Sequence, residues 1–355
     1  MYLRRATLVS AMMGVLMLSP SLYAEDWADK FSITGFASAA FQKSNSTEPF
    51  YNDSGAGVTD KGSWYGNRIG LNINAQINNR ISLATQFLSS RSEENYSVHL
   101  DWGFIAIRAT DELTLRAGKL KNPIGIVNEY RSVGYTYPWI VVPQLYYGEE
   151  MIGATVTREA YSGASLYWEV PTEDWLLSAD LYVGRNSLEF MDVNNVVGLT
   201  VNGEWNDQIL LQGSWYRGTM DDTSGSLPLV TGQLHSVKTL GTRIHIDNFI
   251  GYLEWADVGM GAFRQGKARS WYGTLGYQFG DIMPHISYQY YEKGLGTASP
   301  VEQSMTTLGL RYDWMPNMDI KFELSKIRTD QGTGLFKNAP GKDVKMVGIA
   351  VDVLF

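Results

Sequence analysis

The chain contains no cysteine, so neither disulfide bonds nor thiolate metal ligands can contribute to its fold. Histidine is scarce, with four residues, and the sequence has no spacing typical of a metal site, a P-loop or a dinucleotide-binding loop. No helical heptad repeat or long amphipathic helix occurs, and no change in composition divides the chain into two halves. The sequence therefore predicts no metal site and no cofactor.

The first 24 residues have the features of a signal peptide. Arg4 and Arg5 provide a positive start, the apolar run Ala6–Leu18 follows, and Ala24 precedes a predicted cut before Glu25. A membrane anchor is the alternative, but this run is shorter than the roughly 20 residues that span a bilayer. We expect residues 1–24 to be the signal peptide and residues 25–355 to be the folded domain.

The charge of the chain is negative. The formal net charge is −8, and it becomes −10 when the two arginines leave with the signal peptide. Because nucleic acid is itself a polyanion, we expect no nucleic-acid partner.

Alternation of apolar and polar residues is the main structural signal in the sequence. In residues 68–77 every second residue is apolar, and the residues between them are polar or glycine. The same period of two recurs in residues 177–183, 271–279 and 320–325. A period of two places the two kinds of residue on opposite faces of a β-strand.

The content of the polar face indicates which face is outside. It carries Arg, Asp, Glu, Asn and Gln, which are a poor filling for a dry core but a good lining for a wet passage. Aromatic residues make up 13% of the chain, including 21 Tyr and 11 Trp, and they cluster near strand ends, as at a membrane interface. We therefore predict an all-β, transmembrane antiparallel β-barrel with apolar residues toward lipid.

The connections between the predicted strands alternate between tight and long. Tight turns are predicted at Asn78-Asn79, Thr110-Asp111, Pro171 to Asp174, Trp205 to Asp207, Asp247-Asn248, Gly280-Asp281 and Met315 to Asn317. Long loops are predicted near residues 43–63, 89–96, 120–160, 185–193, 217–236, 258–269, 292–302 and 329–343. Seven turns and eight loops join sixteen strands, with the first at Phe31–Gln42 and the last at Val344–Phe355. Met151–Thr157 also alternates, and we assign it to the third loop or the sixth strand.

The last strand closes on a terminal aromatic residue. Every second residue from Val347 is apolar, and the chain ends with Phe355. Barrels of the Gram-negative outer membrane resemble one another in this closing pattern, which implies recognition of Phe355 by the barrel assembly machinery. The alternative is an ordinary edge strand that happens to end in phenylalanine.

The third long loop differs from the others in length and content. Its apolar, aromatic and proline-containing stretch, from Pro123 to Pro143, would be unfavourable in water, so we expect it to fold into the barrel and narrow the passage. The run Leu113–Gly125 at its entry resembles the corresponding segment of Gram-negative porins related to the phosphate- and polyphosphate-selective group. That resemblance implies a homotrimer of sixteen-stranded barrels, each constricted by the third loop, which passes small hydrophilic solutes or inorganic ions.

Charged residues of both signs lie on the predicted inner face. The acidic residues are Asp101, Asp180, Asp247, Glu254, Asp313 and Glu323. The residues that we predict to line the pore or its constriction are Arg68, Arg116, Lys119, Lys121, Glu129, Arg131, Arg243, Glu254, Arg311 and Lys321. A mixed set favours small polar solutes and gives a hypothesis of weak anion selectivity. Alternatively, the basic residues pair with neighbouring carboxylates or contact lipopolysaccharide and outer-membrane lipid.

Two other functions fit a barrel of this kind. An outer-membrane hydrolase would need a histidine beside a nucleophile or a carboxylate. His99, His245 and His285 fall on the polar face but on different strands, and no sequence motif marks a catalytic site around them. A plugged barrel with a structural or adhesive role is the other alternative. We expect a channel and not an enzyme, exported to the cell outer membrane.

Overall fold

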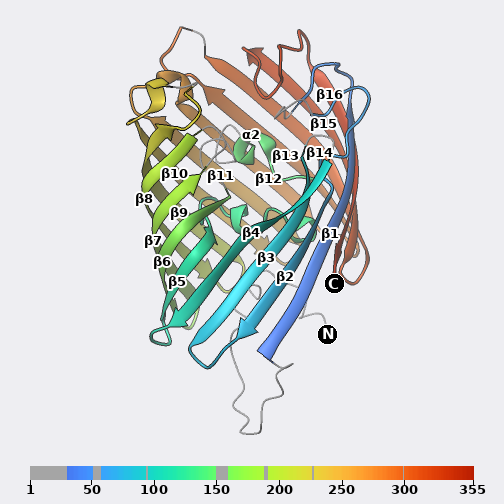
Figure 1. Ribbon diagram of the computed structural model, residues 1–355. Helices are drawn as coiled ribbons and strands as arrows, with labels where there is room; N and C mark the ends of the chain where they lie inside the picture. The colour runs from blue at the N-terminus through green and yellow to red at the C-terminus, as the bar shows by residue number, and fades with distance from the viewer. Residues whose placement is uncertain are drawn as a thin grey trace.

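The computed structural model describes residues 30–50, 57–92, 95–148, 159–187, 191–225, 228–298 and 300–355. These residues form a closed barrel in which each strand pairs antiparallel with its neighbours in the sequence, and β1 pairs with β16 (Figure 1). No helix in the described part of the chain is long and apolar enough to span a membrane.

The sixteen predicted strands are confirmed. Their bounds are β1 Phe31–Ser44, β2 Arg68–Gln76, β3 Ile81–Ser92, β4 Asn95–Arg108, β5 Leu113–Lys121, β6 Ala160–Pro171, β7 Trp175–Ser187, β8 Met191–Trp205, β9 Ile209–Asp222, β10 Leu234–Ile246, β11 Phe249–Met260, β12 Ala268–Tyr277, β13 Ile282–Lys293, β14 Val301–Met315, β15 Met318–Gln331 and β16 Val344–Leu354. The short helices are η2 Asn128–Tyr130, η3 Gly134–Thr136, α2 Gln144–Tyr147, η4 Pro228–Val230 and η5 Arg264–Gly266.

All seven predicted tight turns lie between strands, at the same end of the barrel as the start of β1 and the end of β16. In the turn after β8, Asn206 and Asp207 both have positive φ angles, of 48° and 56°. Such a pair matches the right-handed twist of the flanking strands, and Asn and Asp tolerate this conformation better than most residues. Local turn chemistry therefore fixes this end of the barrel.

The predicted loops are at the other end, but two of them are much shorter than expected. Residues 89–96 belong largely to β3 and β4, which leave only residues 93–94 between them. Residues 185–193 likewise belong mainly to β7 and β8. Backbone pairing with the neighbouring strand continues through these polar stretches, so composition alone overestimated the loops. Met151–Thr157 lies outside the described residues.

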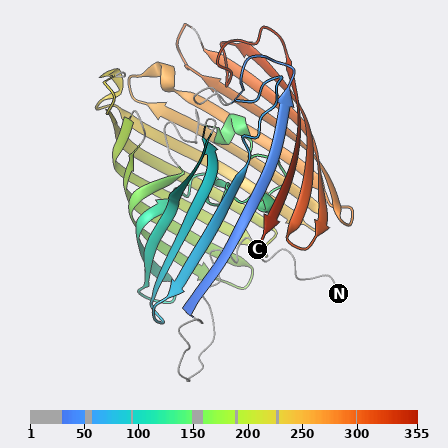
Figure 2. The ribbon, with the colours of Figure 1, turned by 45° about the vertical axis from the view of Figure 1, so that its right-hand side comes forward.

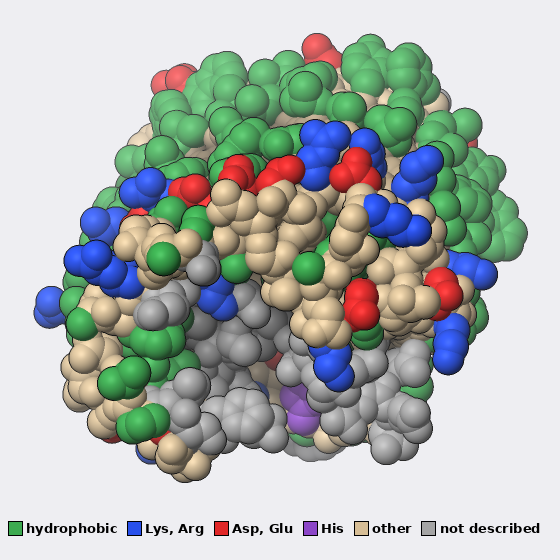
Figure 3. Space-filling view, turned by 90° about the horizontal axis from the view of Figure 1, so that it is seen from above, with side chains coloured by type: hydrophobic (Ala, Val, Ile, Leu, Met, Phe, Trp, Pro, Cys, Tyr) green, Lys and Arg blue, Asp and Glu red, His purple; other side chains and the backbone are tan. Residues whose placement is uncertain are grey.

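The predicted orientation of the two faces is correct. On β15 the apolar residues Phe322 and Leu324 are exposed on the outer surface, whereas Lys321 and Glu323 are buried inside. The space-filling view from above has apolar side chains over the outer wall and charged side chains along the rim (Figure 3). The large exposed apolar surface is what a protein solvated by lipid requires.

Candidate functional site

The segment between β5 and β6 carries η2, η3 and α2, and it is the region from which the site is built. In both ribbon views α2 lies within the barrel, surrounded by strands (Figures 1 and 2). The structure describes Asn122–Gly148 of this segment, and most of these residues are buried. We call these residues the inner loop.

The first part of the inner loop is bound through its backbone. The carbonyl oxygen of Pro123 accepts hydrogen bonds from the hydroxyls of Thr200 and Ser214, at 2.7 and 3.0 Å. Three residues later, the backbone N–H of Ile126 donates to a carboxylate oxygen of Glu254, at 2.8 Å. The loop entry is therefore attached to the inner faces of β8, β9 and β11.

Glu254 is the centre of a buried hydrogen-bond network. Its side chain is 1% exposed, and its other carboxylate oxygen accepts hydrogen bonds from the hydroxyls of Tyr147 on the loop and Tyr272 on β12. The hydroxyl of Tyr147 in turn accepts the backbone N–H of Val127. A buried carboxylate with this many donors holds the two ends of the inner loop together.

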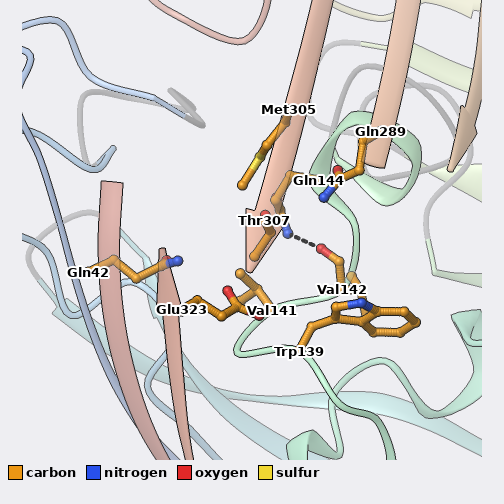
Figure 4. Close-up of a pocket in the computed structure, with 9 residues that line it drawn as sticks. All are labelled: Gln42, Trp139, Val141, Val142, Gln144, Gln289, Met305, Thr307 and Glu323. Atoms are coloured by element: carbon orange, nitrogen blue, oxygen red, sulfur yellow. Dashed lines mark hydrogen bonds between the residues drawn. The ribbon is translucent and has the colours of Figure 1, made fainter. Parts of the chain in front are cut away.

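The second part of the inner loop is bound to the next strands around the barrel, β12, β13 and β15. The backbone N–H of Ile140 donates to Glu323 on β15, and that of Leu145 donates to Gln289 on β13, each at 3.0 Å. The indole N–H of Trp139 lies 3.1 Å from the hydroxyl of Thr274. Figure 4 shows a small pocket between this part of the loop and the wall, with Trp139, Gln289 and Glu323 among the residues that line it.

Two cations of the wall also bind loop carbonyl groups. The ammonium of Lys321 donates to the carbonyl oxygen of Gly134 at 2.6 Å and forms an ion pair with Asp352 at 2.9 Å. The guanidinium of Arg311 donates to the carbonyl oxygen of Tyr135 at 2.7 Å and pairs with Asp319 at 3.2 Å. Glu254, Arg311 and Lys321 therefore point into the barrel, where they bind the loop.

Ionic contacts fix the base of the inner loop. The ammonium of Lys121 lies 2.9 Å from Asp101 and 2.7 Å from Glu159, and the guanidinium of Arg131 lies 2.9 Å from Glu159. Burial would raise the pKa of Glu159, but Arg131 and Lys121 outweigh burial and lower it to about 2. Glu159 therefore remains ionised and joins Arg131 of the inner loop to Lys121 at the end of β5.

The inner face of β5–β10 carries charges that pair with one another. Arg116 forms an ion pair with Asp180, and its guanidinium also lies over the ring of Tyr167, 4.9 Å from the centroid. Arg243 forms an ion pair with Glu204 at 2.6 Å. The arginine side chains remain partly exposed, so they contribute to the wall facing the remaining passage.

Glu129 and Tyr130 are partly exposed residues of η2. Burial raises the pKa of Glu129 to about 7, and the nearby Arg116 opposes this rise. Burial also raises the pKa of Tyr130, which interacts with Arg243. The inner loop thus brings a titratable carboxyl group near the paired charges of the wall.

Arg68 also points into the barrel. Its guanidinium donates to the hydroxyl of Tyr137 on the inner loop, and no carboxylate oxygen of the described residues lies within 4.0 Å of it. Tyr137 donates that hydroxyl to the carbonyl oxygen of Arg131, at 2.8 Å. Arg68 is thus a wall cation that contacts the loop without a close carboxylate partner.

Two predicted inner residues are elsewhere. Lys119 lies on β5 on the same side as Leu115 and Ala117, which is the outer face, and its ammonium donates to the carbonyl oxygen of Leu100. The family-like run Leu113–Gly125 suggested Lys119 as a pore residue, but the run alone does not show on which face of β5 the side chain lies. Asp247 lies in the exposed turn between β10 and β11. Neither residue lines the passage.

The four histidines lie on three different strands. His99 lies on β4, His235 and His245 lie on β10, and His285 lies on β13. His235, which the sequence did not place on the inner face, is buried against Tyr216. No cluster of three His, Asp or Glu that could hold a metal ion is present in the described part of the chain.

The sequence did not identify several residues that hold the loop. Glu159, Asp319 and Asp352 are the acidic partners, and Tyr147 and Tyr272 are the hydroxyl donors. For Asp352 and Tyr272, the period of two already indicated the inner face. Contacts between the wall and the loop, such as Glu254 with Ile126 and Lys321 with Gly134, join positions more than a hundred residues apart, and no local pattern encodes them.

Comparison with known proteins gives a family match. A family model described as Gram-negative porin matches residues 7–332. No curated protein sequence matches the chain.

Several solved structures are similar in fold. The Salmonella typhi OmpF complex with daunomycin is 16% identical, with a TM-score of 0.63, over 94% of this chain and 100% of that one. The anion-selective porin from Comamonas acidovorans is 11% identical, with a TM-score of 0.61, over 92% and 99%. OmpT of Vibrio cholerae is 10% identical, with a TM-score of 0.58, over 94% and 100%.

Proposed function

The chain belongs to the Gram-negative porin family and is an outer-membrane channel for passive diffusion; from this premise we propose that small hydrophilic solutes and inorganic ions cross it between the inner loop and the facing wall. The observation that carries this proposal is the division of the barrel into an apolar outer face and a polar inner face, with the loop bound inside. A polar lining lets hydrated solutes pass and disfavours apolar ones.

The constriction lies where η2 faces β5–β10. Glu129, Tyr130 and Arg131 are the partly exposed residues of the loop there, and Arg116 and Arg243 are the wall residues near them. Lys121 is held at the base of the loop by its two carboxylates and positions the constriction without lining it.

Weak anion selectivity is supported by one feature of the inner face. Most inner cations have a carboxylate partner, which cancels much of their field, whereas Arg68 has none within 4.0 Å among the described residues. The similar structure from Comamonas acidovorans is described as an anion-selective porin. Asp352 and Glu159 interact with Arg68 from a greater distance and reduce its field, so this guanidinium should raise the local concentration of anions only weakly.

Planar-bilayer recording of the purified protein tests the channel and its selectivity together. We expect stepwise single-channel conductance, and a reversal potential in a salt gradient that indicates a small preference for anions. Liposome swelling with sugars of increasing size then measures the open width. Absence of conductance would support a plugged barrel, and a clear cation preference would exclude anion selectivity.

We also propose that the barrel has no catalytic activity. The four histidines lie on three strands, and His245 is opposite Ile250 in the β10–β11 pairing and near Arg243. The test is an assay of lipid and peptide hydrolysis by the purified protein. Activity that disappears in His245→Ala would contradict this proposal.

Export and assembly follow the outer-membrane route. Residues 1–24 act as a cleaved signal peptide, residues 25–355 form the barrel domain, and Phe355 is recognised by the barrel assembly machinery. The mature protein is a homotrimer that contacts lipopolysaccharide and outer-membrane lipid; one similar structure, OmpT of Vibrio cholerae, is described as a trimer form. The mass of the mature chain tests the cut before Glu25, and light scattering in detergent tests the trimer.

A further inference from the structure

Three neighbouring strands change from apolar to basic on their outer face within two residues of one another in the strand register. On β15 the outward residue after Leu324 is Lys326, and on β16 Lys345 precedes Val347. On β1 the outward residue opposite Val347 is Lys43. All three lysines are exposed and lie at the loop end of the barrel, just beyond the apolar belt.

The charges on these strands are poorly compensated. Lys326 and Lys345 are directly opposite each other in the β15–β16 pairing, an arrangement that is unfavourable for like charges. Arg328 is the next outward residue of β15. Asp343 lies 2.8 Å from Lys326 and 3.7 Å from Arg328, and hydrogen bonding to Lys326 lowers the pKa of Asp343. We call Lys43, Lys326, Arg328 and Lys345 the basic patch.

Acidic residues near the basic patch do not balance it. Asp343 is the carboxylate that contacts it within 4.0 Å among the described residues, and Asp330 is the next outward residue of β15 beyond Arg328. Four basic groups therefore share one close carboxylate. The excess positive charge is concentrated on Lys43 and Lys345, which have no ion pair with any described residue.

The outer face of β10–β13 has a different arrangement at the loop end. There Lys238, Asp257, Arg269 and Glu292 are cross-strand partners in succession, so that positive and negative charges alternate around the barrel. Arg269 lies 2.9 Å from Asp257 and 3.9 Å from Glu292. This row neutralises itself, and it shows that the fold can place compensated charges at this height.

We propose that the basic patch binds the phosphate groups of an anionic glycolipid of the outer leaflet. This proposal rests on the proposed function of the barrel in the outer membrane. It assigns specific residues to the lipid contact proposed above. A phosphate group accepts several charge-assisted hydrogen bonds and would relieve the repulsion between Lys326 and Lys345. The apolar residues Leu324 and Val347, immediately below, provide the surface on which the acyl chains of the same lipid would lie.

Continuity with the apolar belt favours a lipid over a free anion. A soluble phosphate would meet the lysines alone, whereas a phosphorylated lipid contacts the basic patch and the belt at once. Basic groups next to a membrane surface attract anionic headgroups, and each contributes to the attraction. The lumen is on the other side of the wall, so this site is separate from the conducting passage.

Lipid retention by the purified full-length protein tests the proposal. The protein in mild detergent is incubated with a bisphosphorylated glycolipid, with its dephosphorylated form, or with inorganic phosphate, and bound molecules are counted by native mass spectrometry. For Lys326→Gln/Lys345→Gln we expect affinity for the bisphosphorylated lipid to fall at least about tenfold. The variant Lys326→Arg/Lys345→Arg keeps the positive charge and should retain most of the affinity for the bisphosphorylated lipid. Lys238→Gln/Arg269→Gln is the matched control on β10–β13 and should leave binding unchanged.

The outcomes are distinct. Equal binding of the phosphorylated and dephosphorylated lipids, or an equal loss in the matched control, would overturn the proposal. Competition by inorganic phosphate as effective as that by the lipid would also overturn it, because the site would then be one for free anions. Single-channel conductance of the Gln variant should remain unchanged. If the unmodified protein showed no channel conductance, the proposed function would be contradicted. The lipid-binding measurements would still test the basic patch on their own.

Discussion

Two parts of the inner wall carry similar charged residues but use them differently. On β11–β16 the residues Glu254, Glu323, Arg311 and Lys321 bind the backbone of the inner loop, and we call this part the anchoring wall. On β5–β10 the charges form ion pairs with one another, as in Arg116 with Asp180, and we call this part the paired wall. An inward charge in a barrel can therefore be a structural ligand of the loop or a part of the passage.

The most buried charges belong to the anchoring wall, although its Arg311 is as exposed as Arg116 of the paired wall, each at 11%. Glu254 and Lys321 are 1% and 0% exposed, whereas the side chains of Arg116 and Arg243 are 11% and 17% exposed. A fully buried charge is stable only with close partners, and on the anchoring wall the loop supplies some of them. We therefore expect substitutions on the anchoring wall to change stability first, and substitutions on the paired wall to change ion flow first.

The largest effect is expected for Lys321→Met. This change leaves Asp352 and Asp319 buried without their shared ammonium, and it removes the donor to the carbonyl group of Gly134. Breaking a buried ion pair of this kind costs about 3–5 kcal/mol. Denaturant unfolding in detergent should measure this loss, with the exposed Lys238→Met as the control. A loss no larger than that of the control would mean that the anchoring wall does not stabilise the barrel.

A smaller loss, of about 2 kcal/mol, is expected for Glu254→Gln, because hydrogen bonds to a charged group become hydrogen bonds to a neutral amide. The amide also cannot accept at both ends, so at least one of the donors Ile126, Tyr147 and Tyr272 loses its partner. We expect the loop to detach part of the time and the single-channel conductance to become noisier and larger on average. Glu204→Gln on the paired wall is the matched control, and equal noise in both variants would remove the distinction between the walls.

Arg243→Gln should affect ion flow more than stability. Its loss leaves the carboxylate of Glu204 without a guanidinium beside the passage, which increases the local negative charge. We expect the anion-to-cation permeability ratio to fall by roughly twofold at low salt and by less at high salt, because salt screens the charge. The reversal potential in a potassium chloride gradient measures this change. An unchanged ratio would indicate that ions do not pass near β10.

The smallest effect is expected from the titration of Glu129. Burial raises its pKa to about 7, so the carboxyl group becomes neutral as the pH falls below this value. The constriction then loses a negative charge near Arg116, Lys121 and Asp180, and the preference for anions should increase modestly. Reversal potentials on either side of pH 7 measure the shift. Glu129→Gln should show the higher anion preference at both pH values, and persistence of the pH dependence in this variant would assign it to another group.

The architecture could be predicted from the sequence because its signals are local. The period of two fixes which residues share a face, and residues such as Asn206 and Asp207 mark the tight turns. The apolar composition of the third loop likewise indicated that it would leave the solvent. Loop lengths near residues 89–96 were overestimated because polar residues there continue the pairing of β3 with β4.

The candidate site was predicted only in part. The alternation identified Arg116, Arg243, Glu254 and other inward charges, but their partners depend on how the barrel closes and where the loop lies. Lys119 shows the limit of a motif, because a shift of one position along a strand moves a side chain to the opposite face. Contacts such as that of Lys321 with Gly134 join distant segments and require the folded structure.

Many of the contacts between the wall and the inner loop are hydrogen bonds from wall side chains to the loop backbone. They involve the backbone groups of Ile126, Gly134, Tyr135, Ile140 and Leu145. A peptide N–H or C=O is present whatever residue occupies the position, proline aside for the donors. Side chains that face the passage can therefore be substituted while the backbone contacts that hold the loop in place are kept. Permeability in such a barrel can evolve, or be engineered, on a scaffold that does not have to be redesigned each time.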